Sequence, residues 1–166
     1  RADFDIDQSL AGGKLALTHN LGHSRHLYAA ASRGYRAGGV NQHPRLAAEN
    51  RPYNPEYLLN FEIGYRASGA QSTTNLTFFH ALRDDQQVSL SSQQNLGDPN
   101  SFFFFTANAS TGRSSGIEFE ESYSLLPTLR LSGSLGLLST HVDAYTFEAA
   151  QDTSATLGNR DAAHAP

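Results

Sequence analysis

The chain has 166 residues, enough for one domain, with 39% hydrophobic residues and a formal net charge of −4. Only 17% of its residues are charged, against about 25% in typical globular domains, and the negative balance gives no electrostatic basis for binding nucleic acid. The lack of cysteine excludes disulfides and thiolate metal sites. No apolar run approaches the ~18–20 residues of a membrane helix, a test that does not exclude a barrel.

Strand patterns recur along the chain, whereas helical periodicity is hard to find. In chain order, we predict strands over residues 14–19, 26–36, 57–68, 73–90, 113–125 and 129–142. Short links separate the members of each pair, at residues 20–25, 68–71 and 126–128. Longer segments follow each pair, at 40–55, 91–101 and 143–166, and we predict that the first and last of these are irregular.

The segment 57–66 shows the clearest alternation. One set of alternate positions is apolar or aromatic, comprising Tyr57, Leu59, Phe61, Ile63 and Tyr65, and the other set includes Asn60, Glu62 and Arg66. Successive side chains of a strand point to opposite faces, so we predict one apolar and one polar face. The apolar row covers roughly 26 Å of strand, or roughly 20 Å of height when tilted, close to the ~25 Å apolar band of outer-membrane barrels.

The alternation of short turns with long loops is typical of antiparallel up-and-down transmembrane β-barrels. The all-β alternative, a soluble β-sandwich or lectin-like carbohydrate-binding domain, would more often have strands of ~5–6 residues. The pattern favours the membrane barrel. Four consecutive aromatics, Phe102 to Phe105, break the alternation, and we interpret them either as part of an aromatic girdle or as a loop anchor.

Several runs resemble TonB-dependent outer-membrane receptors of the siderophore-receptor type. They are Gly34-Tyr35-Arg36-Ala37-Gly38-Gly39, Pro55-Glu56 followed by Glu62-Ile63-Gly64-Tyr65-Arg66, Asp84-Asp85-Gln86-Gln87-Val88, and Gly116-Ile117-Glu118-Phe119-Glu120. The resemblance runs in order over nearly the whole chain. It implies a plugged barrel of about 22 strands, of which about six strands would be a partial barrel domain over residues 1–166. We expect the plug domain and the terminal strands to be absent.

The resemblance implies active transport, not catalysis, with no cofactor and no resident metal. Expected partners are outer-membrane lipid, the plug domain, the TonB complex and a scarce ligand such as a ferric siderophore, at the outer membrane of a Gram-negative bacterium. Candidate ligand-binding residues in the loops and upper wall are Arg36, Asn41, Arg45, Arg51, Tyr53 and Gln87. The planar guanidinium of arginine suits carboxylate or catecholate oxygens, although a solvated loop with ordinary charges is the commoner explanation of such residues.

Alternation places Asn60, Glu62, Arg66, Glu118 and Glu120 on a lumen-facing wall. We expect Arg66, Arg113 and Arg130 to pair with these glutamates, as wall electrostatics or plug docking. The seven histidines are scattered, and His19, His23 and His26 have a helical metal-site spacing in a segment whose pattern is not helical. No Gly-x-Ser-x-Gly nucleophile motif occurs. A passive porin-like or adhesive barrel stays the principal alternative.

Overall fold

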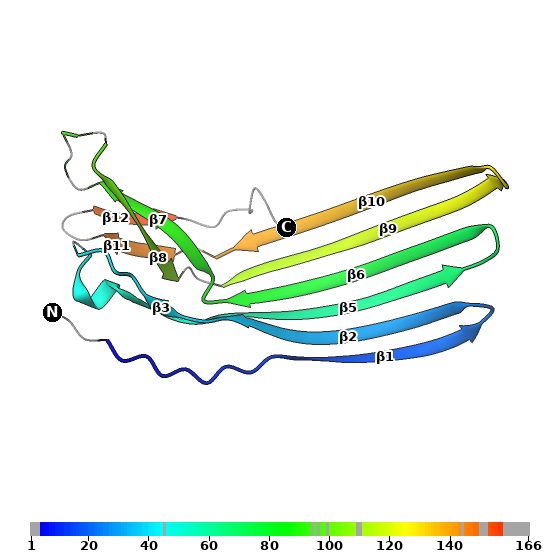
Figure 1. Cartoon of the computed structure of the whole chain (residues 1–166), viewed down its shortest axis with the longest axis horizontal. Coiled ribbons are helices and arrows are strands. Elements are labelled where there is room, and N and C mark those ends of the chain that lie inside the picture. Colours follow the sequence, from blue (N-terminus) through cyan, green and yellow to red (C-terminus); the bar gives the residue numbers. More distant parts are fainter. Residues whose placement is uncertain are drawn as a thin grey trace.

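The computed structural model describes residues 4–44, 46–93, 95, 97–98, 100–108, 111–143, 145–149 and 153–157. Six long strands form one open sheet in the order β1-β2-β5-β6-β9-β10, with every neighbouring pair antiparallel (Figure 1). Their bounds are Gly13–Gly22, Arg25–Arg36, Glu56–Ser68, Ser72–Asp84, Gly112–Leu126 and Leu129–Val142. Tight connections lie at one end of the sheet, the turn end, and the longer segments at the other, the loop end. Within the described residues, no helix is long and apolar enough to cross a membrane.

The predicted antiparallel wall is therefore confirmed, with one strand that ends earlier than expected. The strand predicted over residues 73–90 is wrong beyond Asp84. Asp85 has a φ of 53°, a left-handed conformation that ends the extended run. The chain resumes as β7, Gln87–Gln93, which leaves the sheet and pairs with β8, Phe102–Asn108. The tight turn predicted between β5 and β6 is present at 69–71.

Short elements occupy the loop end, where irregular structure was predicted. β3 (Gly39–Val40) pairs with β4 (Pro52–Tyr53), and a 3-10 turn, η1 (Ala48–Asn50), lies between them. The tail also departs from the prediction, because β11 (Tyr145–Ala149) and β12 (Thr153–Leu157) form an antiparallel hairpin. These pieces are too short for patterns of alternating hydrophobicity to reveal them.

The register aligns the apolar side chains of all six strands on one face, which we call the apolar face. One row across the sheet consists of Leu17, Ala29, Ile63, Phe78, Ile117 and Leu137. Most large members of this face are exposed; Ile63, for example, retains 57% of its accessible surface. A soluble protein rarely leaves such a continuous apolar surface uncovered, so this face requires an apolar environment.

The opposite, polar face is shaped by aromatic side chains lying over glycines of the neighbouring strand. The ring of Tyr28 covers Gly64, and the ring of Phe79 covers Gly116. The Tyr28 hydroxyl shares a hydrogen bond with Thr77 Oγ1 at 3.0 Å. Glycine at these two positions leaves room for the neighbouring ring to lie over the sheet. This packing explains why glycine, which usually weakens a strand, occurs within β5 and β9.

The apolar band crosses the strands obliquely. On β2 and β5 the large apolar side chains end toward the turn end at Leu27 and Tyr65. On β9 and β10 they resume beyond one polar row, Glu121 and Gly133, at Tyr123 and Leu131. A horizontal apolar layer meets successive tilted strands at shifted positions, so this offset is the one expected of strands inclined in a barrel wall.

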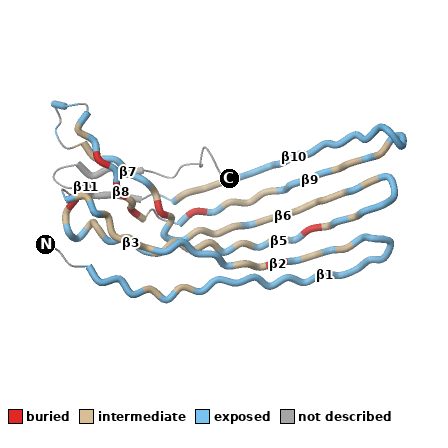
Figure 2. The backbone as a smooth tube through the Cα atoms, viewed as in Figure 1, coloured by how far each residue is buried: buried red, intermediate tan, exposed pale blue. Residues whose placement is uncertain are grey.

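Most buried side chains lie at the loop end, and within the sheet the side chain of Ala30 is also buried (Figure 2). A small core contains Leu46, Phe103, Phe105 and Ala107, with Leu90 packed against it. Phe102 and Phe104 point away and are exposed. Because β8 alternates, the four consecutive phenylalanines have two buried and two exposed members, so the interpretation as a loop anchor applies to Phe103 and Phe105 alone.

Candidate functional site

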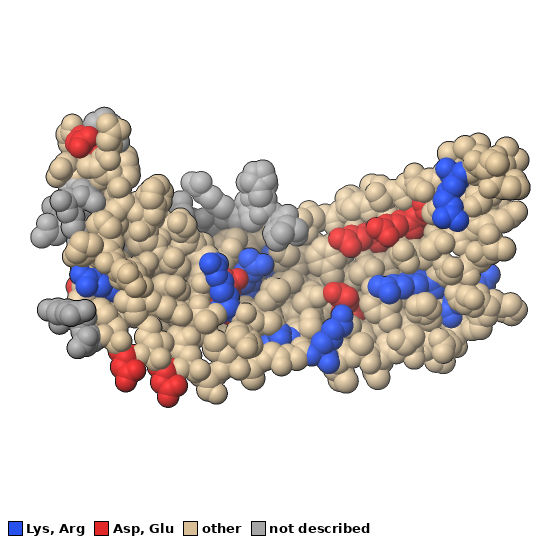
Figure 3. Space-filling model, viewed as in Figure 1, with Lys and Arg blue, Asp and Glu red and all other residues tan. Residues whose placement is uncertain are grey.

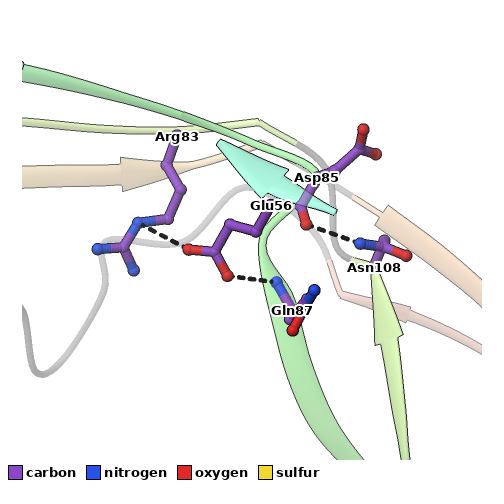
Figure 4. Close-up of polar contacts among 5 residues, drawn as sticks. All are labelled: Glu56, Arg83, Asp85, Gln87 and Asn108. Atoms are coloured by element: carbon purple, nitrogen blue, oxygen red, sulfur yellow. Dashed lines mark hydrogen bonds and ion pairs between the residues drawn. The ribbon is translucent and has the colours of Figure 1, made fainter. Parts of the chain in front are cut away.

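The junction between wall and loops is held by a group of polar side chains that we call the latch. Glu56, at the start of β5, accepts from the backbone N–H of Gln87 (2.9 Å) and pairs with Arg83 Nε (3.3 Å) (Figure 4). The amide of Gln87 donates to the carbonyls of Ala37 and Asn54 at 2.9 and 3.0 Å. Gln87 is buried, so these bonds tie three loop segments to one point.

Asn108, at the end of β8, completes the latch. Its amide nitrogen donates to the carbonyls of Asp85 (2.7 Å) and Asn54 (3.0 Å), and its side-chain oxygen accepts from the N–H of Asn54. Figure 4 shows the contact with the left-handed Asp85. One side chain therefore fixes both the joint where β7 leaves the wall and the loop that leads into β5.

Asn41 and Arg51 organise the segment between β3 and β4. The Asn41 amide donates to Thr106 O and accepts from Thr106 N, both at 2.7 Å, as a strand neighbour would. The guanidinium of Arg51 donates to the carbonyls of Leu46 and Pro44, at 2.9 and 3.0 Å. His43 stacks on Phe103 with ring centroids 4.2 Å apart, which closes this segment over the small core.

These contacts bear on the six candidate ligand residues without testing ligand binding itself. Asn41, Arg51 and Gln87 use polar atoms within the loops. Tyr53 lies over Gly39, and Arg45 is outside the described residues. Arg36 is in register with Glu56, but both oxygens of Glu56 are already engaged by the latch, and Arg36 stays exposed. All six remain predictions, and of the two described arginines, Arg36 has the more available guanidinium.

The five wall candidates share the polar face, as the alternation predicted. Asn60 donates to Glu62 at 2.7 Å, and Asn75 donates to Glu120 at 3.2 Å. Figure 3 shows acidic side chains gathered over β9, with basic side chains on both sides of them. Glu118 is exposed within this acidic run.

The predicted arginine–glutamate pairs are not formed among the described residues. Arg66 lies 4.7 Å from the ring centroid of Tyr28, a cation–π contact, and Arg130 donates to Ser124 Oγ. The expectation for Arg113 is wrong for a geometric reason. Arg113 shares the alternation of Ile117 and so lies on the apolar face, opposite to Glu118 and Glu120.

No group of three His, Asp or Glu side chains able to hold a metal ion occurs in the part of the chain that the structure describes. One shallow cavity on the sheet, about 400 Å³, is lined by residues of β6, β9 and β10 that include Asn75, Glu120 and Ser134. Sequence reasoning missed Asn54 and Asn108, because nothing in the sequence marked an asparagine as a loop clamp.

An open antiparallel wall with one apolar face, tight turns at one end and organised loops at the other defines a section of a transmembrane β-barrel. The family model described as "TonB dependent receptor-like, beta-barrel" matches residues 2–165. The chain therefore belongs to the TonB-dependent receptor β-barrel family.

The solved structures include a similar fold. It is the ferric yersiniabactin uptake receptor FyuA from Yersinia pestis, with a TM-score of 0.62 and 20% sequence identity over 76% of this chain. The match covers 18% of the FyuA chain, so this chain spans less than a fifth of it. No curated protein matches this chain. The FyuA match supports the assignment as part of a larger barrel and goes no further than the fold.

Proposed function

We propose that this chain is wall and loop structure of an outer-membrane receptor that imports a scarce ligand with energy from TonB. The apolar face meets lipid, and the polar face lines the interior and contacts a plug domain. The proposal is supported by the family membership, together with the arrangement of the strands into one wall that has tight turns at one end and organised loops at the other. Polar recognition chemistry is concentrated at the loop end, where a ligand arrives from outside.

The ligand class we propose is an anionic iron chelate, a ferric siderophore. Arg36 supports this choice because it is an exposed cation on the polar face at the loop end, with its register partner Glu56 already neutralised by Arg83. A guanidinium forms bidentate, charge-assisted hydrogen bonds with carboxylate or catecholate oxygens. The exposed Phe102 and Phe104 lie on the adjoining hairpin and offer aromatic surface to such a ligand.

The proposal is tested by uptake of radiolabelled ferric chelates into cells that lack the complete receptor and into cells in which it is restored. Uptake should be saturable, should require the receptor and should stop when TonB is removed. Non-saturable uptake that persists without TonB would identify a passive porin-like barrel and overturn the proposal.

Arg36→Gln tests the assignment of the ligand contact. Loss of hydrogen bonds to a charged group costs ~1.5–3 kcal/mol, so the half-saturating chelate concentration should rise roughly 10-fold to 150-fold. Arg130→Gln, the same change at the turn end of the polar face, is the matched control and should leave uptake unchanged. Equal effects of the two variants would remove Arg36 from the site.

A further inference from the structure

The apolar face is interrupted at its loop end by a polar patch on β6, β9 and β10, which we call the outer cationic patch. Its members are His80, Arg113, Ser115, Ser139 and His141. The register places His80, Ser115 and Ser139 in one row and Arg113 and His141 in the next. The row on the other side consists of Phe78, Ile117 and Leu137, which are exposed apolar side chains. The patch therefore borders directly on the apolar band.

The histidines of the patch have side-chain partners, whereas Arg113 has none among the described residues. His80 Nδ1 lies 2.7 Å from Ser115 Oγ, and His141 Nε2 lies 3.4 Å from Asp143 Oδ1. Asp143 is half exposed, and Asp84, exposed at the end of β6, lies on the same face one row beyond Arg113. Arg113 is exposed and has no hydrogen bond or ion pair among the described residues. Arginine remains protonated in proteins, so this is a permanent positive charge.

The height of the patch follows from the strand geometry. Arg113 is in register with Leu82 and Leu59, and Leu59 lies two residues inside Tyr57, the aromatic end of the apolar row on β5. Neighbouring strands lie ~4.8 Å apart, so in a wall tilted by about 40° each strand step shifts a register row by roughly 3 Å along the membrane normal. β9 is two steps from β5 on the side where the band extends toward the turn end, which raises Arg113 roughly 6 Å above Leu59, to the level of Tyr57. That level is the aromatic boundary of the apolar band, where the hydrocarbon layer meets the lipid headgroups.

We propose that the outer cationic patch binds the phosphate of a membrane lipid in the leaflet at the loop end. The guanidinium of Arg113 forms two hydrogen bonds with the phosphate, and the hydroxyls of Ser115 and Ser139 and the imidazole of His141 offer further donors. An acyl chain of the same lipid packs on Ile117 and Leu137. The inference rests on the proposed orientation of the two faces in the membrane.

Two features favour a lipid over other occupants. A free inorganic anion would use the cation but leave the adjoining exposed surfaces of Ile117 and Leu137 uncovered. A second copy of the chain in a two-fold contact would bring an identical cationic patch against this one, which like-charge repulsion disfavours. A lipid that carries a phosphate would pair that phosphate with the positive charge and cover the apolar row with an acyl chain.

The experiment measures retention of phosphatidic acid by the complete receptor in detergent micelles, using native mass spectrometry across a lipid titration. The double variant Arg113→Gln with His141→Gln should bind phosphatidic acid at least roughly fivefold more weakly, the value of one lost arginine charge near a membrane surface. Arg130→Gln is the matched control on the polar face and should bind as the unmodified receptor does. Arg113→Lys should restore part of the loss.

Several outcomes would overturn the inference. They are binding changed less than twofold in the double variant, an equal loss in Arg130→Gln, equal retention of phosphatidylcholine, or displacement of the lipid by equimolar inorganic phosphate. Receptor that migrates as a folded, heat-modifiable band shows that any loss is not unfolding. Chelate uptake, measured in parallel, separates the two proposals: normal uptake with unchanged lipid binding refutes only the lipid site, and absent uptake with selective lipid binding refutes only the transport function.

Discussion

Phe61 and Asn60 are neighbours on β5 that face opposite sides of the wall, and arginine at these two positions should have very different effects. Phe61 lies on the apolar face and is 43% exposed. It is four residues from Tyr57 and four from Tyr65, the aromatic ends of the apolar row, so it lies roughly 10 Å from each boundary after allowing for tilt. That is the middle of the hydrocarbon layer.

Arginine at the bilayer midplane of a barrel costs ~2–4 kcal/mol, so Phe61→Arg should lower the unfolding free energy by that amount. Asn60→Arg loses the hydrogen bond to Glu62 but places a cation beside the same carboxylate. Its cost should stay below ~1 kcal/mol, the net value of a typical hydrogen bond. The difference corresponds to a factor of at least about five in the folding equilibrium.

The assay is reversible unfolding of the complete receptor in lipid vesicles with urea, monitored by tryptophan or tyrosine fluorescence and by heat-modifiable migration in gels. Comparison at a single strand height removes differences in depth, because adjacent residues are only ~3.3 Å apart along the strand. Equal destabilisation of the two variants, or greater damage from Asn60→Arg, would refute the assignment of the faces.

Three further predictions concern the packing. Gly116→Ala should destabilise the barrel by ~1–3 kcal/mol in the same urea assay, because the new Cβ would lie 2.6 Å from a backbone carbonyl, whereas Gly136→Ala enters open space and should be nearly neutral. Phe103→Ala should lower hydrogen-exchange protection across β7 and β8 by ~3 kcal/mol, and Phe104→Ala, at an exposed site, should not; similar losses would contradict the loop core. Asn108→Ala should speed exchange at the joint between β6 and β7 while the wall keeps its protection, and a wall-wide change would count against a local clamp.

The six-stranded wall was predictable because side chains along a strand alternate between two faces with a period of two residues. Alternation in β5, β9 and β10 placed Phe61, Ile117 and Leu135 on one face, and the register confirms that placement across the whole sheet. The same alternation places Arg113 on the apolar face, which is correct. The prediction was wrong because it paired Arg113 with glutamates that lie on the opposite face. Charge complementarity acts only between side chains on the same face.

The loop end was less predictable because single side chains determine it. The sequence pattern of residues 73–90 predicts one long strand, yet the left-handed residue Asp85 interrupts that strand. The side chain of Asn108, distant in the sequence, hydrogen-bonds to the carbonyl of Asp85 and stabilises this conformation. Contacts between residues 23 positions apart leave no local pattern in a sequence. The ligand candidates illustrate the same limit, since Asn41 and Gln87 turned out to hold backbone groups of other segments.

The joint at Asp85 separates two parts of the chain that are subject to different structural constraints. Before it, every substitution must preserve alternation, because a shift by one residue would turn each side chain of β6 to the wrong face. Beyond it, β7 and β8 pair only with each other and pack on a small core that also includes Leu46. Substitutions in that hairpin that spare Gln87 and Asn108 should therefore leave the register of the wall intact.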